Sequence, residues 1–177
     1  MEEWKGKNLF FIDAETDGLY GPPISVGVIV TDHFCRGIER AYYGIDKEKL
    51  EVHDPWVREN VLPILGNYEN VKDENELLEK VWELWDKYRD KAYAVADVAF
   101  PVEMGIFQKA VKAAPDDRKF NGPYPFIDIS GILLARGIDP LTERKSLINM
   151  NSKDKQHNAL FDVEMSVEIW KKYILGE

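Results

Sequence analysis

The first third of the chain consists of short apolar runs separated by turn residues. Residues 8–14 and 24–31 are rich in β-branched and aromatic side chains, and a Gly-Leu-Tyr-Gly-Pro-Pro segment lies between them. Residues 38–44 repeat this composition. The pattern therefore predicts three consecutive antiparallel strands joined by turns.

From residue 74 onward the apolar positions follow a helical period. Between 74 and 88 they recur every three or four residues with Glu and Lys between them, which predicts an amphipathic helix. The short apolar run 92–96 predicts a buried strand, and 102–113 predicts a second helix. The remaining predicted elements are a strand at 126–129, a helix near 131–136 and a last helix from about 158 to 175.

Strands that alternate with helices indicate an α/β fold, because parallel strands are connected through helices. Together with the N-terminal strands, this order predicts a central mixed β-sheet of three antiparallel strands plus parallel strands, flanked by helices. Residues 1–177 contain no repeat, low-complexity tract or Pro/Gly-rich linker, so we expect one domain.

The composition restricts the expected cellular compartment and the types of side chain that could bind a metal. Of the 177 residues 45% are hydrophobic, yet no stretch approaches the ~20 apolar residues of a membrane span. The first residues lack the features of a signal peptide, so we expect a cytoplasmic protein without a membrane partner. Cys35 is the only cysteine, which excludes an internal disulfide and leaves oxygen or imidazole as metal ligands.

The charge balance argues against one class of nucleic-acid protein. With 32 acidic and 23 basic residues the net charge is -9, which repels polyanions at long range and argues against a duplex-coating protein. An enzyme that acts on one nucleic-acid end stays compatible with this charge, because bound divalent cations reverse its sign locally.

Two carboxylates stand at the end of the first predicted strand. Asp13 and Glu15 are two residues apart, so in a strand they lie on the same face with their charges close together. Such a pair is unfavourable unless a cation or a proton joins it, and hard oxygen ligands suit Mg²⁺ or Mn²⁺. The alternative is that the carboxylates begin a solvated turn at Asp17-Gly18.

Two later segments carry further candidates. Asp97 directly follows the predicted strand 92–96, at the sheet edge where α/β folds place their sites, although it could instead cap the next helix. His157 precedes the last predicted helix, and Asp162 follows it by five positions. Taken alone, a histidine at a helix start is more often a surface residue than a base.

These segments together resemble the three motifs of DnaQ-like 3′-to-5′ exonucleases of the DEDDh type. The motifs are Asp-x-Glu-Thr-x-Gly-Leu from residue 13, an aspartate after the middle strand, and His-x₄-Asp from residue 157; the resemblance spans 10–174. Two departures are present. The sequence Ala-Val-Ala-Asp lacks the asparagine that many members place before this aspartate, and Asp17 stands where threonine is frequent.

The resemblance implies a ribonuclease H-like fold and a metal-dependent exonuclease that releases nucleoside 5′-monophosphates from single-stranded RNA or DNA 3′ ends. His157 would be the general base, Thr16 would contact the terminal sugar, and Leu19 would lie against the last base. A homodimer stays open. The two divalent ions, Mg²⁺ or Mn²⁺, would be held by Asp13, Glu15, Asp97 and Asp162.

Two rival functions stay open at this point. A ribonuclease H-like endonuclease shares the sheet and the carboxylates, although the His157/Asp162 spacing argues against it. The other rival is a nucleic-acid-binding protein of the same fold that lacks turnover, although all five expected catalytic side chains are present.

Several neighbouring residues are expected to have structural roles. Asp128 should cap a helix, and Glu164, about 200° around the helix from Asp162, should point away from it. Phe100 could form a second stacking surface, but we expect it to be buried under the sheet; core packing is the alternative for Leu19.

Overall fold

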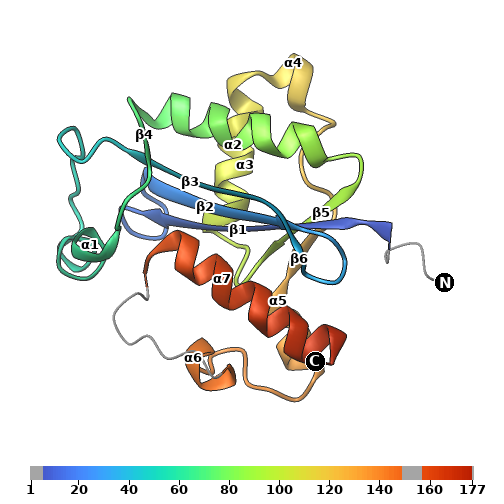
Figure 1. Cartoon of the computed structure of the whole chain (residues 1–177). Coiled ribbons are helices and arrows are strands. Elements are labelled where there is room, and N and C mark those ends of the chain that lie inside the picture. Colours follow the sequence, from blue (N-terminus) through green and yellow to red (C-terminus); the bar gives the residue numbers. More distant parts are fainter. Residues whose placement is uncertain (1–5, 149–156, 177) are drawn as a thin grey trace.

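A computed structural model describes residues 6–148 and 157–176, in which six strands form one mixed sheet in the order β4-β3-β2-β1-β5-β6 (Figure 1). The three N-terminal strands pair antiparallel, whereas β5 pairs with β1, β6 with β5 and β4 with β3 in parallel. The predicted mixed sheet is thus confirmed. The strands are β1 (Asn8–Thr16), β2 (Pro23–Thr31), β3 (Gly37–Ile45), β4 (Glu69–Val71), β5 (Ala92–Ala96) and β6 (Phe126–Asp128).

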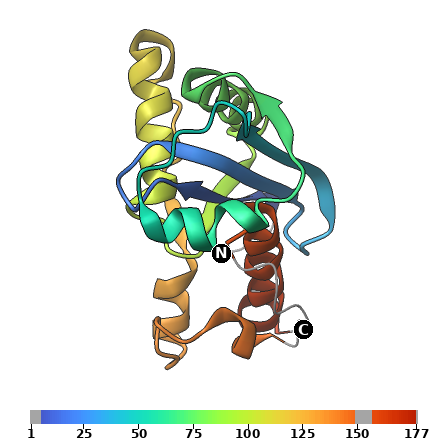
Figure 2. The same cartoon turned by 90° about the vertical axis from the view of Figure 1, so that its left-hand side faces the viewer.

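Helices cover both faces of this sheet (Figures 1 and 2). On one face lie α2 (Glu74–Tyr88) and α3 (Val102–Ala113), followed by the short α4 (Pro115–Arg118). The other face carries α5 (Ile129–Ala135), α6 (Arg144–Leu147) and α7 (Ala159–Trp170), which continues as a π-helical turn, η3 (Lys171–Leu175). None of the helices in the described ranges is long and apolar enough to cross a membrane.

Strand β1 divides the core into two halves, because successive side chains of a strand point to opposite faces. Phe10 packs edge-on against Trp85 of α2, with ring centroids 5.4 Å apart. Phe11 packs against Trp170 of α7 in the same manner at 5.7 Å. Both phenylalanines are fully buried, so β1 is fixed from both sides where it leads to Asp13.

Short elements are absent from the prediction. These are α1 (Pro55–Asn60), η2 (Leu62–Ile64), β4, α4 and α6, each of six residues or fewer. A helix of one or two turns, or a strand of three residues, contains too few apolar positions to establish a period in the sequence. Helix α5 also begins earlier than predicted, at Ile129. Its N-cap is Asp128, as expected, and the Asp128 side chain accepts a hydrogen bond from the Gly131 amide.

The start of α7 lies in direct backbone contact with β2. A Cβ atom at Gly27 would come within 2.6 Å of backbone atoms of Ala159 and Leu160, so only glycine permits this approach. Gly27 is the residue paired with Asp13 in the adjacent strand. The contact therefore places the first turn of α7, which carries Asp162, beside Asp13.

A capping residue fixes the same turn from the other side. The Asn158 side chain accepts a hydrogen bond from the Phe161 amide, as helix N-caps do. Its Nδ2 group donates to the carbonyls of Ile64 and Leu65, at 3.0 and 2.8 Å. The 62–65 segment thereby holds the beginning of α7 over the sheet.

We predict that Gly27→Ala lowers the melting temperature by about 2–12 °C, since overpacking costs about 1–3 kcal/mol and each kcal/mol corresponds to about 2–4 °C at this size. Gly37→Ala in β3 is the matched control, because a Cβ there meets nothing within 4 Å. Thermal unfolding of the two variants checks this. Equal melting temperatures would show that α7 does not depend on the Gly27 contact.

Candidate active site

Residues from four distant segments line one pocket of about 160 Å³. Asp13 comes from β1, Asp97 follows β5, and His157 and Asp162 belong to the start of α7. The neighbouring residues of the lining are Arg144, Lys145, Met165, Ser166 and Ile169. Four of the five predicted catalytic side chains thus meet in one place, while their roles stay a prediction.

The fifth side chain, Glu15, lies close to His157 and Asp162 at the start of α7. One ligand atom from each of Glu15, His157 and Asp162 lies within 4.8 Å of the other two, which makes them a group that could hold a metal ion. Glu15 and Asp13 lie on the same face of β1, as their spacing predicts.

Burial and mutual repulsion raise the pKa values of these carboxyl groups. For Asp13, burial is the largest cause and the nearby Asp162 charge the next, and its pKa lies well above the ordinary value. Burial and then Asp162 raise the pKa of Glu15 to about 8. Burial raises the pKa of Asp162 to about 7, although the hydrogen bond from the His157 amide opposes this. Without a cation, the cluster therefore retains protons near neutral pH.

The Asp162 carboxylate offers a direct test of whether a cation fits. Its Oδ2 accepts a hydrogen bond from the His157 amide at 2.9 Å, whereas Oδ1 is buried and has no hydrogen-bond partner among the described residues. A buried acceptor without a partner is unfavourable unless something else satisfies it. Because all the neighbouring ligands are carboxylate oxygens or imidazole, the site fits a hard divalent cation.

His157 is held where its ring can reach the cluster. Its backbone adopts the left-handed conformation, with φ at 69°. The ring packs edge-on against Trp56 of α1 at 5.0 Å between centroids. Burial, with a contribution from Lys145, lowers the imidazole pKa, so the ring is neutral at pH 7 and able to accept a proton.

A further carboxylate, Glu103, faces the cluster and was not predicted. Its Oε1 accepts a hydrogen bond from the Ala14 amide, between Asp13 and Glu15, at 3.2 Å. The side chain is only 5% exposed, and burial raises its pKa to about 8. An acidic residue in the first turn of a helix is ordinary, so only the packing of α3 against β1 reveals its position.

Arg144 is the second residue that the sequence did not single out. Its Nε lies 2.7 and 2.8 Å from the two oxygens of Asp97. Burial raises the pKa of Asp97, and the hydrogen bond and charge of Arg144 act against this shift. Asp97 does not cap α3, whose N-cap is Pro101. The alternative role considered for Asp97 is therefore wrong.

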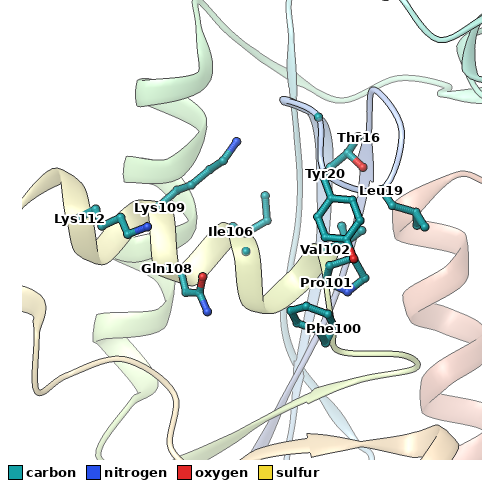
Figure 3. Close-up of a pocket in the computed structure, with 12 residues that line it drawn as sticks. Thr16, Leu19, Tyr20, Phe100, Pro101, Val102, Ile106, Gln108, Lys109 and Lys112 are labelled. Atoms are coloured by element: carbon teal, nitrogen blue, oxygen red, sulfur yellow. The ribbon is translucent and has the colours of Figure 1, made fainter.

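A second pocket, of about 310 Å³, lies between the β1–β2 turn and α3 (Figure 3). Thr16, Leu19 and Phe100 lie on one side of it, and Gln108, Lys109 and Lys112 of α3 lie on the other. Leu19 is 66% exposed and Phe100 60%, so the expected burial of Phe100 is wrong, as is core packing of Leu19. Phe100 lies beyond the end of β5, in the segment that leads to α3, and so it is not covered by the sheet.

Other acidic residues near the motifs have structural roles. Asp17 accepts hydrogen bonds from the backbone amides of His53 and Asp54, both at 2.8 Å. Burial opposes ionisation of Asp17, but these hydrogen bonds prevail and lower its pKa. Glu164 forms an ion pair with Arg40 of β3, facing away from Asp162 as expected.

Comparison with known proteins gives matches in structure alone. No protein-family model and no curated protein sequence matches the chain. Exonuclease I from Methylocaldum szegediense matches with a TM-score of 0.68 and 16% identity, over 96% of this chain and 41% of that chain. Zinc-bound E. coli exonuclease I with single-stranded DNA matches at 0.64 and 17%, with coverages of 96% and 41%. A 3′-exonuclease specific for the 3′ end of a histone mRNA stem-loop matches at 0.64 and 13%, with coverages of 96% and 82%.

The chain spans about two fifths of the length of the exonuclease I chains. At these identities the likeness shows the fold alone, which this chain shares with these exonucleases. The E. coli enzyme has been solved in both zinc-bound and metal-free forms.

We predict that the metal-free protein loses stability as the pH rises from about 5 to about 8, because the unfolded chain ionises carboxyl groups that the folded protein keeps protonated. The groups concerned are Glu15 and Glu103, with pKa values of about 8, and Asp162, with a pKa of about 7. Thermal unfolding in EDTA should show a decrease of at least about 4 °C over this interval.

Glu103→Gln should reduce this decrease, since glutamine still accepts the Ala14 hydrogen bond but carries no charge. Glu164→Gln, in a residue that faces away from the cluster, should leave it unchanged. A melting temperature that is constant or rises with pH in EDTA contradicts the assigned pKa shifts.

Proposed function

We propose that this protein is a metal-dependent 3′-to-5′ exonuclease that releases nucleoside 5′-monophosphates from single-stranded RNA or DNA. One observation carries the proposal. Partly buried carboxylates from β1, from the residue after β5 and from α7 meet beside a neutral histidine, with one Asp162 oxygen left unsatisfied among the described residues. The fold, shared with exonucleases of known structure, supports the same conclusion.

Asp13, Glu15, Asp97 and Asp162 are the residues that would hold the divalent ions, Mg²⁺ or Mn²⁺. When bound, such ions orient the attacking water and neutralise the charge that develops on the phosphate. His157 acts as the general base, because its lowered pKa leaves the imidazole neutral and able to take the proton from water. Trp56 and the left-handed backbone at His157 fix the direction of the ring.

The Leu19/Phe100 pocket would receive the terminal nucleotide. It is flanked by the same two segments as the carboxylate cluster, because Thr16 follows Asp13 on β1 and Phe100 follows Asp97. Two exposed apolar side chains accept the flat face of any base, which makes the pocket tolerant of sequence. Exonuclease I bound to oligodeoxynucleotides and the histone mRNA 3′-exonuclease are precedents for DNA and RNA, respectively.

We predict that the purified protein shortens 5′-labelled single-stranded oligonucleotides from the 3′ end in Mn²⁺ or Mg²⁺ and is inactive in EDTA. Asp13→Asn should abolish the reaction, and His157→Ala should reduce it about 10²- to 10⁴-fold, the usual contribution of a general base. Glu164→Gln is the control with an intact cluster. Gel electrophoresis of the products and thermal stability of each variant are the measurements.

A circular single-stranded substrate distinguishes the proposed exonuclease from a ribonuclease H-like endonuclease. An exonuclease leaves it intact, whereas cleavage of the circle indicates a ribonuclease H-like endonuclease. Binding without degradation of linear strands in Mn²⁺ indicates a nucleic-acid-binding protein that lacks turnover. Either result contradicts the proposed activity.

We further predict that Leu19→Ala and Phe100→Ala weaken oligonucleotide binding by about 5- to 150-fold each, the equivalent of about 1–3 kcal/mol per stacked base. Phe34→Ala is the matched control, because Phe34 is also exposed, at 51%, but lies in the β2–β3 turn. Fluorescence anisotropy in the Asp13→Asn background measures affinity without degradation. Equal affinities for all three variants would contradict the assignment of this pocket to the terminal base.

A further inference from the structure

The Arg144–Asp97 pair occupies one side of the carboxylate cluster. A single nitrogen, Nε, is within hydrogen-bond distance of both Asp97 oxygens, at 2.7 and 2.8 Å. Both side chains are shielded from water, with 13% of Arg144 and 26% of Asp97 exposed. Charge-assisted hydrogen bonds in such surroundings are strong, so any other ligand of Asp97 must compete with Arg144.

The guanidinium group is held in place by its own loop. Nη1 of Arg144 donates to the carbonyl oxygens of Pro140 and Thr142, at 2.8 and 2.6 Å. These contacts come from the segment immediately before α6, so the arginine is anchored independently of Asp97. The loop therefore presents a fixed positive charge to the carboxylate.

The other half of the cluster is arranged differently. Glu15, His157 and Asp162 already lie within 4.8 Å of one another, and Asp162 Oδ1 has no hydrogen-bond partner in the described ranges. This half is ready to accept a cation without breaking a contact. At Asp97 a cation must first replace the bond to Arg144.

We propose that Arg144 is a resident counter-ion that competes with metal for Asp97, so that the two divalent ions bind unequally. This inference rests on the proposed metal-dependent function. Glu15 and Asp162 would hold the first ion, and Asp97 would hold the second more weakly, because its bond to the Arg144 guanidinium would have to be displaced. Arg144 is accordingly a positioning residue that sets the order of metal loading, and in the metal-free protein it offsets the repulsion that Asp97 would add.

The test compares Arg144→Gln with Lys145→Gln in the full chain. Both residues line the pocket and both substitutions remove one positive charge. Arg144 is bonded to Asp97, whereas the charge of Lys145 acts on Asp162 and His157. Isothermal titration with Mn²⁺ alone measures the number and affinity of the ions, without reference to nuclease activity. Thermal unfolding in EDTA and in Mn²⁺ is the second measurement.

We expect the wild-type protein to bind one Mn²⁺ tightly and one weakly. Arg144→Gln should strengthen the weak site selectively, by about tenfold or more, since a charge-assisted pair no longer competes there. It should also lower the melting temperature in EDTA and increase the gain on adding Mn²⁺. Lys145→Gln should act mainly on the tight site, because the charge of Lys145 acts on Asp162, and should not strengthen the weak site selectively. Arg144→Lys should fall between wild type and Arg144→Gln.

Unchanged or weakened binding at the second site in Arg144→Gln overturns the inference while leaving the proposed function intact. Absence of Mn²⁺ binding in the wild-type protein contradicts both. If Arg144→Gln does not fold, Arg144→Lys decides in its place, and a second-site affinity equal to that of the wild type then counts against competition.

Discussion

The contact between Gly27 and the first turn of α7 is the constraint on which the site depends. It allows two backbones to approach more closely than any side chain would permit, directly opposite Asp13. Asn158 fixes the same turn from the other side by donating hydrogen bonds to the carbonyls of Ile64 and Leu65. A carboxylate 149 positions away in the sequence, Asp162, is in this way held rigidly beside Asp13. Rigid positioning of ligands is what a metal site requires.

The cluster concentrates negative charge where the protein can least solvate it. Burial is the largest cause of the raised pKa at Asp13, Glu15, Glu103 and Asp162, with repulsion between neighbours next in importance for Asp13 and Glu15. The folded state tolerates this because β1 is held between two aromatic contacts, Phe10 with Trp85 and Phe11 with Trp170. The same repulsion would favour a bound cation, which is the physical basis of the proposed metal site.

The surroundings of the cluster divide into regions with different chemistry. On the Leu19/Phe100 side two exposed apolar side chains lie near Lys109 and Lys112 of α3, a combination that suits the proposed binding of a terminal nucleotide. On the Arg144 side a fixed guanidinium balances Asp97. A net charge of -9 repels polyanions at long range, so the proposed nucleic-acid ligand would depend on the positive charge that cations bound at this end of the sheet would supply.

The sequence by itself determined the long elements and the identity of the acidic residues. Periodic apolar positions predict α2, α3 and α7, and apolar runs predict β1, β2 and β5, because these elements bury a continuous face. Local capping likewise identified the role of Asp128. Short elements such as α6 contain too few positions for a period. Contacts between distant segments leave no local signal at all, because they depend on which surfaces pack together. Only the tertiary structure therefore showed Glu103 beneath β1, Arg144 on Asp97 and Phe100 exposed at the pocket.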